Sequence, residues 1–360
     1  MAPFEAARSL GDPQDAAESN GLRYVSVESS GISRRKRGKG FSYYSPNGNR
    51  IEEARILARI RSLAVPPAWN DVWICPFPNG HIQATGRDAR GRKQYRYHAV
   101  FRELREGTKF EHIIGFGSAL PRIRQMVKRH MALRGLPREK VLATVVRLLE
   151  AMLIRVGNDD YAQQNKSYGL TTLKNRHVAV EGSDIRFKFK GKSGKEWSRA
   201  INNRRIAKIV RQCQELPGQE LLQYIGEDGN THDVTSGDVN AYLREITGKD
   251  ITAKDFRTWA GTVLAAIALQ KFDIFGCEAQ AKRNLRAAIE VVASRLGNTA
   301  MVCRKCYVHP EIVSAYLDGN LIRAMQCAVE KEPRDSFSDL RSEEAAVMAV
   351  LNTRLRPVRR

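Results

Sequence analysis

The sequence predicts an α+β protein, in which an N-terminal antiparallel β domain is followed by a mainly helical domain with a small β-sheet. Residues 22–103 contain short apolar runs separated by prolines and Asn-Gly turns, a pattern typical of antiparallel strands. From residue 104 onward, apolar residues recur mostly at helical spacing. Within this helical part, Ile185, Phe187 and Phe189 alternate with basic residues, which indicates a strand with one apolar face.

The length of the chain favours two domains. It has 360 residues, and a domain typically takes about 150. We expect a disordered arm over 1–21, a β-rich domain over 22–103, a helical domain over 104–328 and a charged tail over 329–360. The tail contains one short amphipathic helix (SEEAAVMAVLNTRL) and ends in Arg-Pro-Val-Arg-Arg. Domains of this size need no metal or disulfide to hold their cores.

In the β-rich domain, residues 23–31 (RYVSVESSG) alternate sufficiently to predict a strand. GFSYY then leads into Ser45-Pro46-Asn47-Gly48, a hairpin signal. The segment IEEARILARIRSLA carries apolar residues at helical spacing and predicts one helix. Short strands are expected again in AVPPAWNDVWICPFPNGHIQATG.

In the helical domain, VLATVVRLLEAMLIRVGN predicts an apolar helix whose last turn carries Arg155, with Gly157 as its terminator. Thr252 and Asp255 form a capping box ahead of FRTWAGTVLAAIALQ. A further helix, AKRNLRAAIEVVASRL, should stop at Gly297. Between them, residues 191–194 (GKSG) should turn the small sheet's chain back on itself.

The charge of the chain points to nucleic acid. Sixty Lys and Arg against 39 Asp and Glu leave a formal charge of +21, and a polyanion would relieve that self-repulsion. Residues 33–39 and 87–97 are rich in arginine and lysine, and the second segment also contains interleaved tyrosines. Such segments can grip phosphates, although a basic run can also be a solvated face or a nuclear import signal.

The remaining features limit cofactors and location. No apolar run is long enough for a membrane span, and the first residues lack a basic leader and an apolar core. Six scattered cysteines favour reduced thiols in the cytoplasm. Cys303-x-x-Cys306 with His309 lacks the second ligand pair of a zinc site. The GKS at 191–193 is not a P-loop, because Arg186 stands where that motif needs glycine. We expect neither metal nor cofactor.

Cleaving a phosphodiester without a metal requires three kinds of group. Fixed cations must stabilise the nonbridging oxygens, an acid must protonate the leaving oxygen, and a nucleophile must attack. Arginine suits the first task and lysine the second. Tyrosine suits the third, because its phenol is a tolerable nucleophile and a good leaving group.

Several spaced motifs carry a family resemblance. IRVGNDDYAQQNKSYGLTTLKNRHV, KGKSGKEW, KDFRTWAGT and LGNTAMVCRKCYVHPEI occur in that order. Together they resemble the compact type IB DNA topoisomerases of bacteria and poxviruses. RIRSLAVPPAWNDVWICPFPNGHIQATGRDARGRKQYRYH resembles that family's N-terminal β domain. The resemblance covers residues 22–325 and implies the tyrosine recombinase/topoisomerase IB-like fold.

The resemblance implies catalytic roles for five residues. Arg155 and Arg257 would bind the scissile phosphate, and Lys192 would protonate the leaving 5′-oxygen. Tyr307 would attack and form a 3′-phosphotyrosyl bond. Asn298 stands where the poxvirus enzymes have histidine, so it can donate a hydrogen bond but cannot carry charge. Tyr316 is a rival nucleophile by sequence, but the step from Asn298 to Tyr307 matches the family.

The resemblance also implies DNA contacts. Gln94, Tyr95 and Tyr97 match a segment that contacts the major groove, and Arg92 and Lys93 belong to the same basic segment. Further positions that match supporting residues of the active site or the DNA backbone are Gly157, Tyr161 and Lys254.

The predicted function is therefore relaxation of supercoils of either sign, without ATP or an obligatory metal. We expect a monomer that encloses double-stranded DNA with two lobes, does not bind membranes and acts in the bacterial cytoplasm at the nucleoid. A tyrosine recombinase or integrase is the nearest alternative, although such enzymes usually carry His-x-x-Arg where Lys254-x-x-Arg257 stands. A non-catalytic DNA-binding protein on the same fold is the other alternative.

Overall fold

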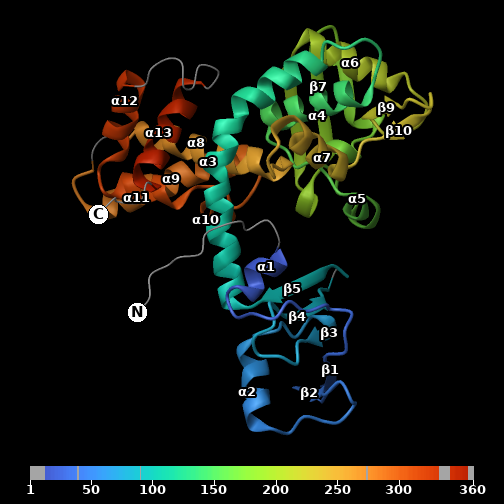
Figure 1. Cartoon of the computed structure of the whole chain (residues 1–360), viewed down its shortest axis with the longest axis vertical. Coiled ribbons are helices and arrows are strands. Elements are labelled where there is room, and N and C mark those ends of the chain that lie inside the picture. The colour runs from blue at the N-terminus through green and yellow to red at the C-terminus, as the bar shows by residue number, and fades with distance from the viewer. Residues whose placement is uncertain (1–12, 39, 90, 273–274, 332–340, 356–360) are drawn as a thin grey trace. The chain divides into compact units, whose positions relative to one another are not determined.

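The computed structural model describes residues 13–38, 40–89, 91–272, 275–331 and 341–355. The chain divides into two compact units, Met1–Glu111 and His112–Arg360, each described by itself below. The long helix α3 (Ala99–His130) contains the division between them. The expected α+β class, with an antiparallel N-terminal sheet followed by a mainly helical part, is confirmed (Figure 1).

The first unit contains a five-stranded sheet in the order β2-β1-β3-β4-β5, with every neighbouring pair antiparallel. Its small core lies between the sheet and α2, with Ile60 of the helix and Ile74 of the sheet at 2% and 0% exposure. The elements of this unit are α1 (Pro13–Glu18), β1 (Ile32–Arg37), β2 (Gly40–Tyr44), α2 (Ala54–Ser62), β3 (Asn70–Ile74), β4 (Ile82–Arg87) and β5 (Lys93–Tyr97).

Two local predictions in this unit have opposite outcomes. The turn at Ser45–Gly48 is confirmed: the Gly48 amide donates to the Ser45 carbonyl at 2.9 Å, and Gly48 has a φ of +82° that favours glycine. The strand expected over 23–31 is wrong, since this segment makes only an isolated bridge from Arg23 to Gly80. Its alternation is too short to pair along a neighbour, and the strand begins at Ile32 instead.

The ends of the chain also differ from the expected arm and tail. Pro13–Glu18 form α1, and Ala17 is fully buried. Near the other end, the short helix expected in the tail is confirmed as α13 (Ser342–Leu355), but its apolar face, including Val347 and Leu351, packs into the core of the second unit. The rest of the expected arm (1–12) and tail (332–340 and 356–360) lies outside the described residues.

The second unit is built mainly from helices around a three-stranded antiparallel sheet, β6-β7-β8, and a two-stranded sheet, β10-β9. Its elements after α3 are α4 (Arg138–Met152), α5 (Asp159–Asn165), β6 (Val178–Glu181), β7 (Asp184–Lys190), β8 (Glu196–Asn202), α6 (Arg204–Gln214), β9 (Gln223–Ile225), β10 (Thr231–Asp233), α7 (Ser236–Thr247), α8 (Ala253–Gln270), α9 (Glu278–Leu296), α10 (Ala300–Cys306), α11 (Pro310–Leu317), α12 (Leu321–Lys331) and α13.

Three sequence signals act as predicted here. The capping box of Thr252 and Asp255 starts α8, and Gly297, with a φ of +64°, ends α9. Ile185, Phe187 and Phe189 of β7 alternate buried with exposed residues, as a one-faced strand requires.

The end of α4 is a correction. The helix stops at Met152, and Leu153 takes the left-handed conformation with a φ of +56°, so Arg155 lies beyond the helix and not in its last turn. The carbonyls of Arg155 and Val156 accept from the amides of Leu170 and Thr171 at 2.9 and 2.6 Å. These longer-range bonds replace the helical pattern and fix the backbone that carries Arg155.

Candidate active site

The five candidate catalytic residues all lie in the second unit, each at the end of an element or just beyond it, apart from Arg257. Arg155 follows α4, Lys192 lies at the tip of the β7–β8 hairpin, and Arg257 lies in the second turn of α8. Asn298 follows α9, and Tyr307 follows α10. The residues come from five segments spread over about 150 positions, so packing alone can bring them together.

Arg257 is the buried centre of the site, with 3% of its surface exposed. Its Nη2 donates to the Leu296 carbonyl at 2.7 Å, and its Nη1 donates to the Leu153 carbonyl. Each carbonyl belongs to the end of a helix, α9 and α4, where backbone acceptors lack helical partners. Arg257 therefore joins these two helix ends and also satisfies their carbonyls.

The electrostatic setting of Arg257 is unusual. Burial lowers its pKa and nearby Arg155 lowers it further, whereas the neighbouring Tyr307 phenol opposes the shift. Arginine still stays charged near neutrality, because its ordinary pKa is far higher. Its buried Nε has no hydrogen-bond partner among the described residues. A buried cation with an unused donor favours an incoming anion.

Asn298 lies beside this cation. Its Oδ1 accepts a hydrogen bond from Nη2 of Arg155, which places Arg155, Arg257 and Asn298 around one region. The Nδ2 of Asn298 is buried without a hydrogen-bond partner among the described residues, and the amide faces the buried Cys303 thiol. Unused donors on Arg257 and Asn298, with two guanidinium groups, are the chemistry that a phosphate requires.

Tyr307 ends α10 within reach of Arg257. The guanidinium carbon of Arg257 lies 5.1 Å from the centre of the Tyr307 ring, and the phenol is partly exposed. The Tyr307 amide donates to the Cys303 carbonyl at 2.9 Å, which closes the last turn of α10. The rival Tyr316 is 2% exposed and its Oη accepts from Asn284 Nδ2 at 2.8 Å, so it serves as a core residue.

Two residues of α8 that sequence reasoning missed hold the Tyr307 backbone. A Cβ added to Gly261 would lie 2.5 Å from the Tyr307 carbonyl oxygen and 3.0 Å from its Cβ, so only glycine permits this approach. Thr262 Oγ1 accepts from the His309 amide at 3.1 Å and lies 3.3 Å from the same carbonyl, while the nearer acceptor for its single proton is the Thr258 carbonyl at 2.8 Å. The motif that supplies Arg257 thus also positions Tyr307, one turn further along the helix.

Lys192 is exposed at a tight hairpin tip. The Gly191 amide donates to the Lys195 carbonyl at 2.8 Å, and the Gly194 amide donates to the Gly191 carbonyl at 3.0 Å. Ser193 takes a left-handed φ of 64°. The turn predicted at 191–194 is confirmed.

The other expected supporting positions also lie in the second unit. Lys254 is exposed in the first turn of α8. Gly157 has a φ of +123°, and a Cβ on Gly169 would lie 2.5 Å from the Gly157 nitrogen, so these two glycines allow the backbone beside Arg155 to pack closely. Tyr161 lies in α5, and its side chain falls outside the described residues.

The expected DNA-contact segment forms β5, an edge strand of the first unit. Lys93 and Tyr95 project to solvent, with the Lys93 ammonium 5.8 Å from the Tyr95 ring, and Tyr95 stacks on Tyr97 at 5.9 Å. Arg92 and Gln94 instead bond the Asp88 carboxylate at 2.7 and 3.0 Å. In the two basic segments, 33–39 and 87–97, Lys39 and Arg90 lie outside the described residues.

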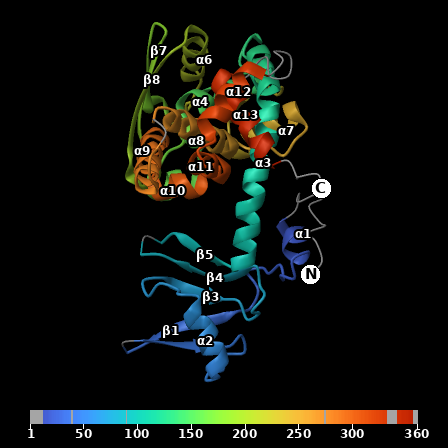
Figure 2. The ribbon, with the colours of Figure 1, turned by 90° about the vertical axis from the view of Figure 1, so that its left-hand side faces the viewer.

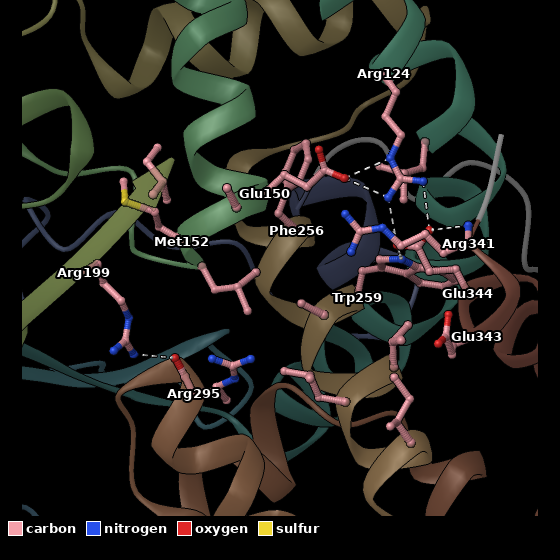
Figure 3. Close-up of a pocket in the computed structure, with 18 of the residues that line it drawn as sticks. Arg124, Glu150, Met152, Arg199, Phe256, Trp259, Arg295, Arg341, Glu343 and Glu344 are labelled. Atoms are coloured by element: carbon pink, nitrogen blue, oxygen red, sulfur yellow. Dashed lines mark hydrogen bonds and ion pairs between the residues drawn. The ribbon is translucent and has the colours of Figure 1, made fainter. Parts of the chain in front are cut away.

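A cavity of about 420 Å³ lies between α4, β8, α8 and the start of α13 (Figure 3). None of the five candidate catalytic residues lines it. It borders their supports, because its wall includes Leu153, whose carbonyl accepts from Arg257, and Arg295, which precedes the second acceptor, Leu296. Glu344 at one side of the cavity accepts from Arg124 at 2.9 Å and from Trp259 Nε1 at 3.3 Å.

Two kinds of feature are absent from the described residues. None of the helices there is both long and apolar enough to cross a bilayer. In the same part of the chain, no group of three or more His, Cys, Asp and Glu side chains could hold a metal ion.

Comparisons with known proteins identify the family of the chain. Residues 98–332 match the family described as eukaryotic DNA topoisomerase I, catalytic core, and residues 40–88 match the bacterial DNA topoisomerase IB N-terminal domain. DNA topoisomerase 1B of Acanthamoeba polyphaga mimivirus is 33% identical over 285 residues, which are 77% of this chain and 85% of the viral protein. DNA topoisomerase 1B of Vaccinia virus (strain Copenhagen) and DNA topoisomerase I of Monkeypox virus are each 27% identical over 139 residues, 38% of this chain and 44% of theirs. The chain therefore belongs to the type IB DNA topoisomerases, a family of isomerases that act on DNA.

Proposed function

We propose that the protein relaxes supercoiled double-stranded DNA through a transient break in one strand, with Tyr307 holding the 3′ end as a phosphotyrosine. The observation that carries the proposal is the convergence of Arg155, Arg257 and Asn298 beside the Tyr307 phenol. Arg257 Nε and Asn298 Nδ2 are buried there without partners. A phosphodiester placed among these groups would meet fixed positive charge on its nonbridging oxygens.

The proposed cleavage step makes one bond and breaks one. Tyr307 Oη attacks the phosphorus as its proton passes to solvent, and the bond from phosphorus to the 5′-oxygen breaks. Lys192 gives a proton to that 5′-oxygen, so a neutral hydroxyl leaves. Arg155, Arg257 and Asn298 stabilise the charge that grows on the nonbridging oxygens.

The reverse step uses the same groups. The 5′-hydroxyl attacks the phosphorus of the phosphotyrosine while Lys192 accepts the hydroxyl proton, the bond from phosphorus to Tyr307 Oη breaks, and the phenolate recovers a proton from solvent. Because one phosphate ester is exchanged for another, the cycle needs no nucleotide hydrolysis and no obligatory metal. Rotation of the duplex while the bond is open would remove supercoils of either sign.

We also propose that the protein acts as a monomer at the bacterial nucleoid in the cytoplasm. The match of residues 40–88 to a bacterial type IB domain supports this location. The charge of +21 supports binding along the phosphate backbone.

The test is to trap and map the covalent bond. The protein is incubated with negatively or positively supercoiled plasmid in the presence of EDTA, denatured rapidly, and the peptide linked to DNA is sequenced. Tyr307→Phe should abolish both relaxation and the adduct while leaving duplex binding unchanged, whereas Tyr316→Phe should retain both activities. Relaxation by Tyr307→Phe, or an adduct on another residue, would contradict the proposal, and recombined plasmid would favour an integrase.

A further inference from the structure

The indole of Trp197 lies between two glycines that border candidate catalytic residues. Gly191 precedes Lys192, and a Cβ there would lie 2.7 Å from Cδ1 and Nε1 of Trp197. Gly297 precedes Asn298, and a Cβ there would lie 3.0 Å from Cη2 of the same ring, with Cζ2 closer still. The five-membered ring of one buried indole, 5% exposed, therefore lies against Gly191, and its six-membered ring lies against Gly297.

Further contacts fix the indole within the hairpin. Trp197 is paired with Phe189 across β7 and β8, and the two rings are stacked with centres 6.3 Å apart and planes 3° from parallel. The Arg199 guanidinium lies 5.1 Å from the Trp197 ring, and its Nη2 donates to the Arg295 carbonyl at 3.4 Å (Figure 3). The hairpin thus meets the last turn of α9 through two neighbouring side chains, and Figure 2 shows β8 beside that helix.

The β7 side of the hairpin pairs with β6 and, next to the Lys192 turn, is bonded to residues 167 and 168. The Tyr168 amide donates to the Lys190 carbonyl at 2.8 Å, and Ser167 Oγ donates to the Gly191 carbonyl at 3.3 Å. These bonds constrain the backbone before Lys192 but do not reach α9. Trp197 is thus a direct contact between the Lys192 turn and the end of α9.

The end of α9 is where both arginines are held. The Leu296 carbonyl accepts from Arg257, and Asn298 accepts from Arg155. Gly297 lies between these two acceptors, with the benzene edge of Trp197 against it. A shift of the indole would change the distance from the lysine turn to the phosphate-binding groups.

We propose that Trp197 is a positioning residue that sets the place of Lys192 relative to Arg155, Arg257 and Asn298. The inference rests on the proposed function, because it requires Lys192 to protonate the leaving oxygen. Only a two-ring side chain spans both glycines, so phenylalanine would fill the core but lose contact at one edge. General acid catalysis is sensitive to such displacement, since about 1 Å can cost about 100-fold in rate.

The experiment measures single-turnover cleavage by the full-length protein on two duplexes, one with a natural phosphate and one with a 5′-bridging phosphorothiolate. The sulfur leaving group needs no proton, so a defect in the acid should vanish on it. On the natural substrate, Trp197→Ala should be slowed about 10- to 100-fold and Trp197→Phe less. Both should approach the wild-type rate on the phosphorothiolate, with unchanged duplex affinity.

A glycine pair tests the contact without touching the tryptophan. Gly297→Ala would strain the backbone and strike the indole, whereas Gly248→Ala strains a similar left-handed helix end, with a φ of +67° against +64°, and meets nothing within 4 Å. Gly297→Ala should reproduce the selective defect of Trp197→Phe, and Gly248→Ala should not. Thermal melts of all variants identify any that fail to fold.

The outcomes separate the two proposals. If Lys192→Ala is not rescued by the phosphorothiolate, the general-acid role fails and the positioning role fails with it. Rescue of Lys192→Ala would support the general-acid role. If the folded Trp197→Phe and Gly297→Ala variants then cleave both substrates equally slowly, or cleave both at the wild-type rate, the inference about Trp197 is overturned and the proposed function remains.

Discussion

Arg257 and Lys192 are held by the fold in opposite ways. Arg257 is 3% exposed on a long helix, and two backbone carbonyls accept its hydrogen bonds. Lys192 is exposed at the tip of a hairpin whose turn depends on backbone bonds between glycines and Lys195. One cation is part of the protein interior, and the other is presented from its surface.

The difference fits the two proposed tasks. A group that stabilises a developing charge gains from burial, because a low-dielectric site strengthens the interaction and needs no rearrangement. A group that donates a proton to the leaving oxygen and later recovers it must reach that oxygen in the bound DNA, so an exposed hairpin tip suits it. Stability and catalysis should therefore be coupled at Arg257 and separate at Lys192.

The largest effect on relaxation is expected for Arg257→Ala. Loss of a charged donor should slow cleavage by about 1000-fold or more. Two buried carbonyls would also lose their partner, at a cost of about 1–3 kcal/mol each in the free energy of unfolding. Single-turnover cleavage and urea denaturation measure the two effects, with Arg283→Ala on the exposed face of α9 as the control. If Arg257→Ala is as stable as the wild type, the hydrogen bonds from Arg257 to the two carbonyls do not stabilise the fold.

Lys192→Ala should come next, with a rate loss of about 100- to 10,000-fold on a natural phosphate. Because the Lys192 side chain is exposed, the melting temperature of Lys192→Ala should equal that of the wild-type protein. Lys195→Ala is the matched control, since it removes a lysine from the same turn and keeps the carbonyl that accepts from Gly191. If Lys192→Ala and Lys195→Ala slow cleavage equally, the reaction requires positive charge at this turn and does not require proton donation by Lys192 in particular.

Glu344→Gln should affect stability and leave the relaxation rate of the folded protein almost unchanged. Burial would raise the pKa of Glu344, but hydrogen bonds from Arg124, the Arg341 amide and Trp259 outweigh it and hold this pKa below its usual value. A lowered folded pKa gives stability that is present above the unfolded pKa of about 4.3 and is lost as pH falls through the folded value.

At neutral pH, the free energy of unfolding of Glu344→Gln should therefore be about 1.5–3 kcal/mol lower than that of the wild type, because Arg124 loses its charged hydrogen bonds to Glu344 while keeping its ion pair with Glu150. The difference in the free energy of unfolding between Glu344→Gln and the wild type should become smaller as the pH falls below about 4. Exposed Glu343→Gln is the control. A gap that stays constant as the pH falls would contradict the role of the charged carboxylate.

The smallest effect is expected in the first unit, at Lys93→Ala. The exposed ammonium of Lys93 should neutralise about one phosphate, so the slope of log affinity against log salt should fall by about one. Lys282→Ala serves as the control, because that lysine is already paired with Glu278 at 2.7 Å. An unchanged slope in Lys93→Ala would exclude the exposed face of β5 from the phosphate contacts.

The sequence by itself determined most elements and the identity of the candidate site. Thr252 and Asp255 marked the start of α8, Gly297 marked the end of α9, and alternation marked β7. These signals are local, because caps, turns and periodicity depend on residues a few positions apart. The strand predicted over 23–31 shows the limit of such signals, since a strand also needs a partner along its length.

Only the tertiary structure decided how the site is supported. Arg257 bonds the ends of α4 and α9, Gly261 admits the Tyr307 backbone, and Trp197 lies between the turn of Lys192 and Gly297. Each contact joins segments tens of residues apart, and its existence depends on how closely packed surfaces approach. A motif names the groups that react, whereas the packing of distant helices and strands sets the distances between them.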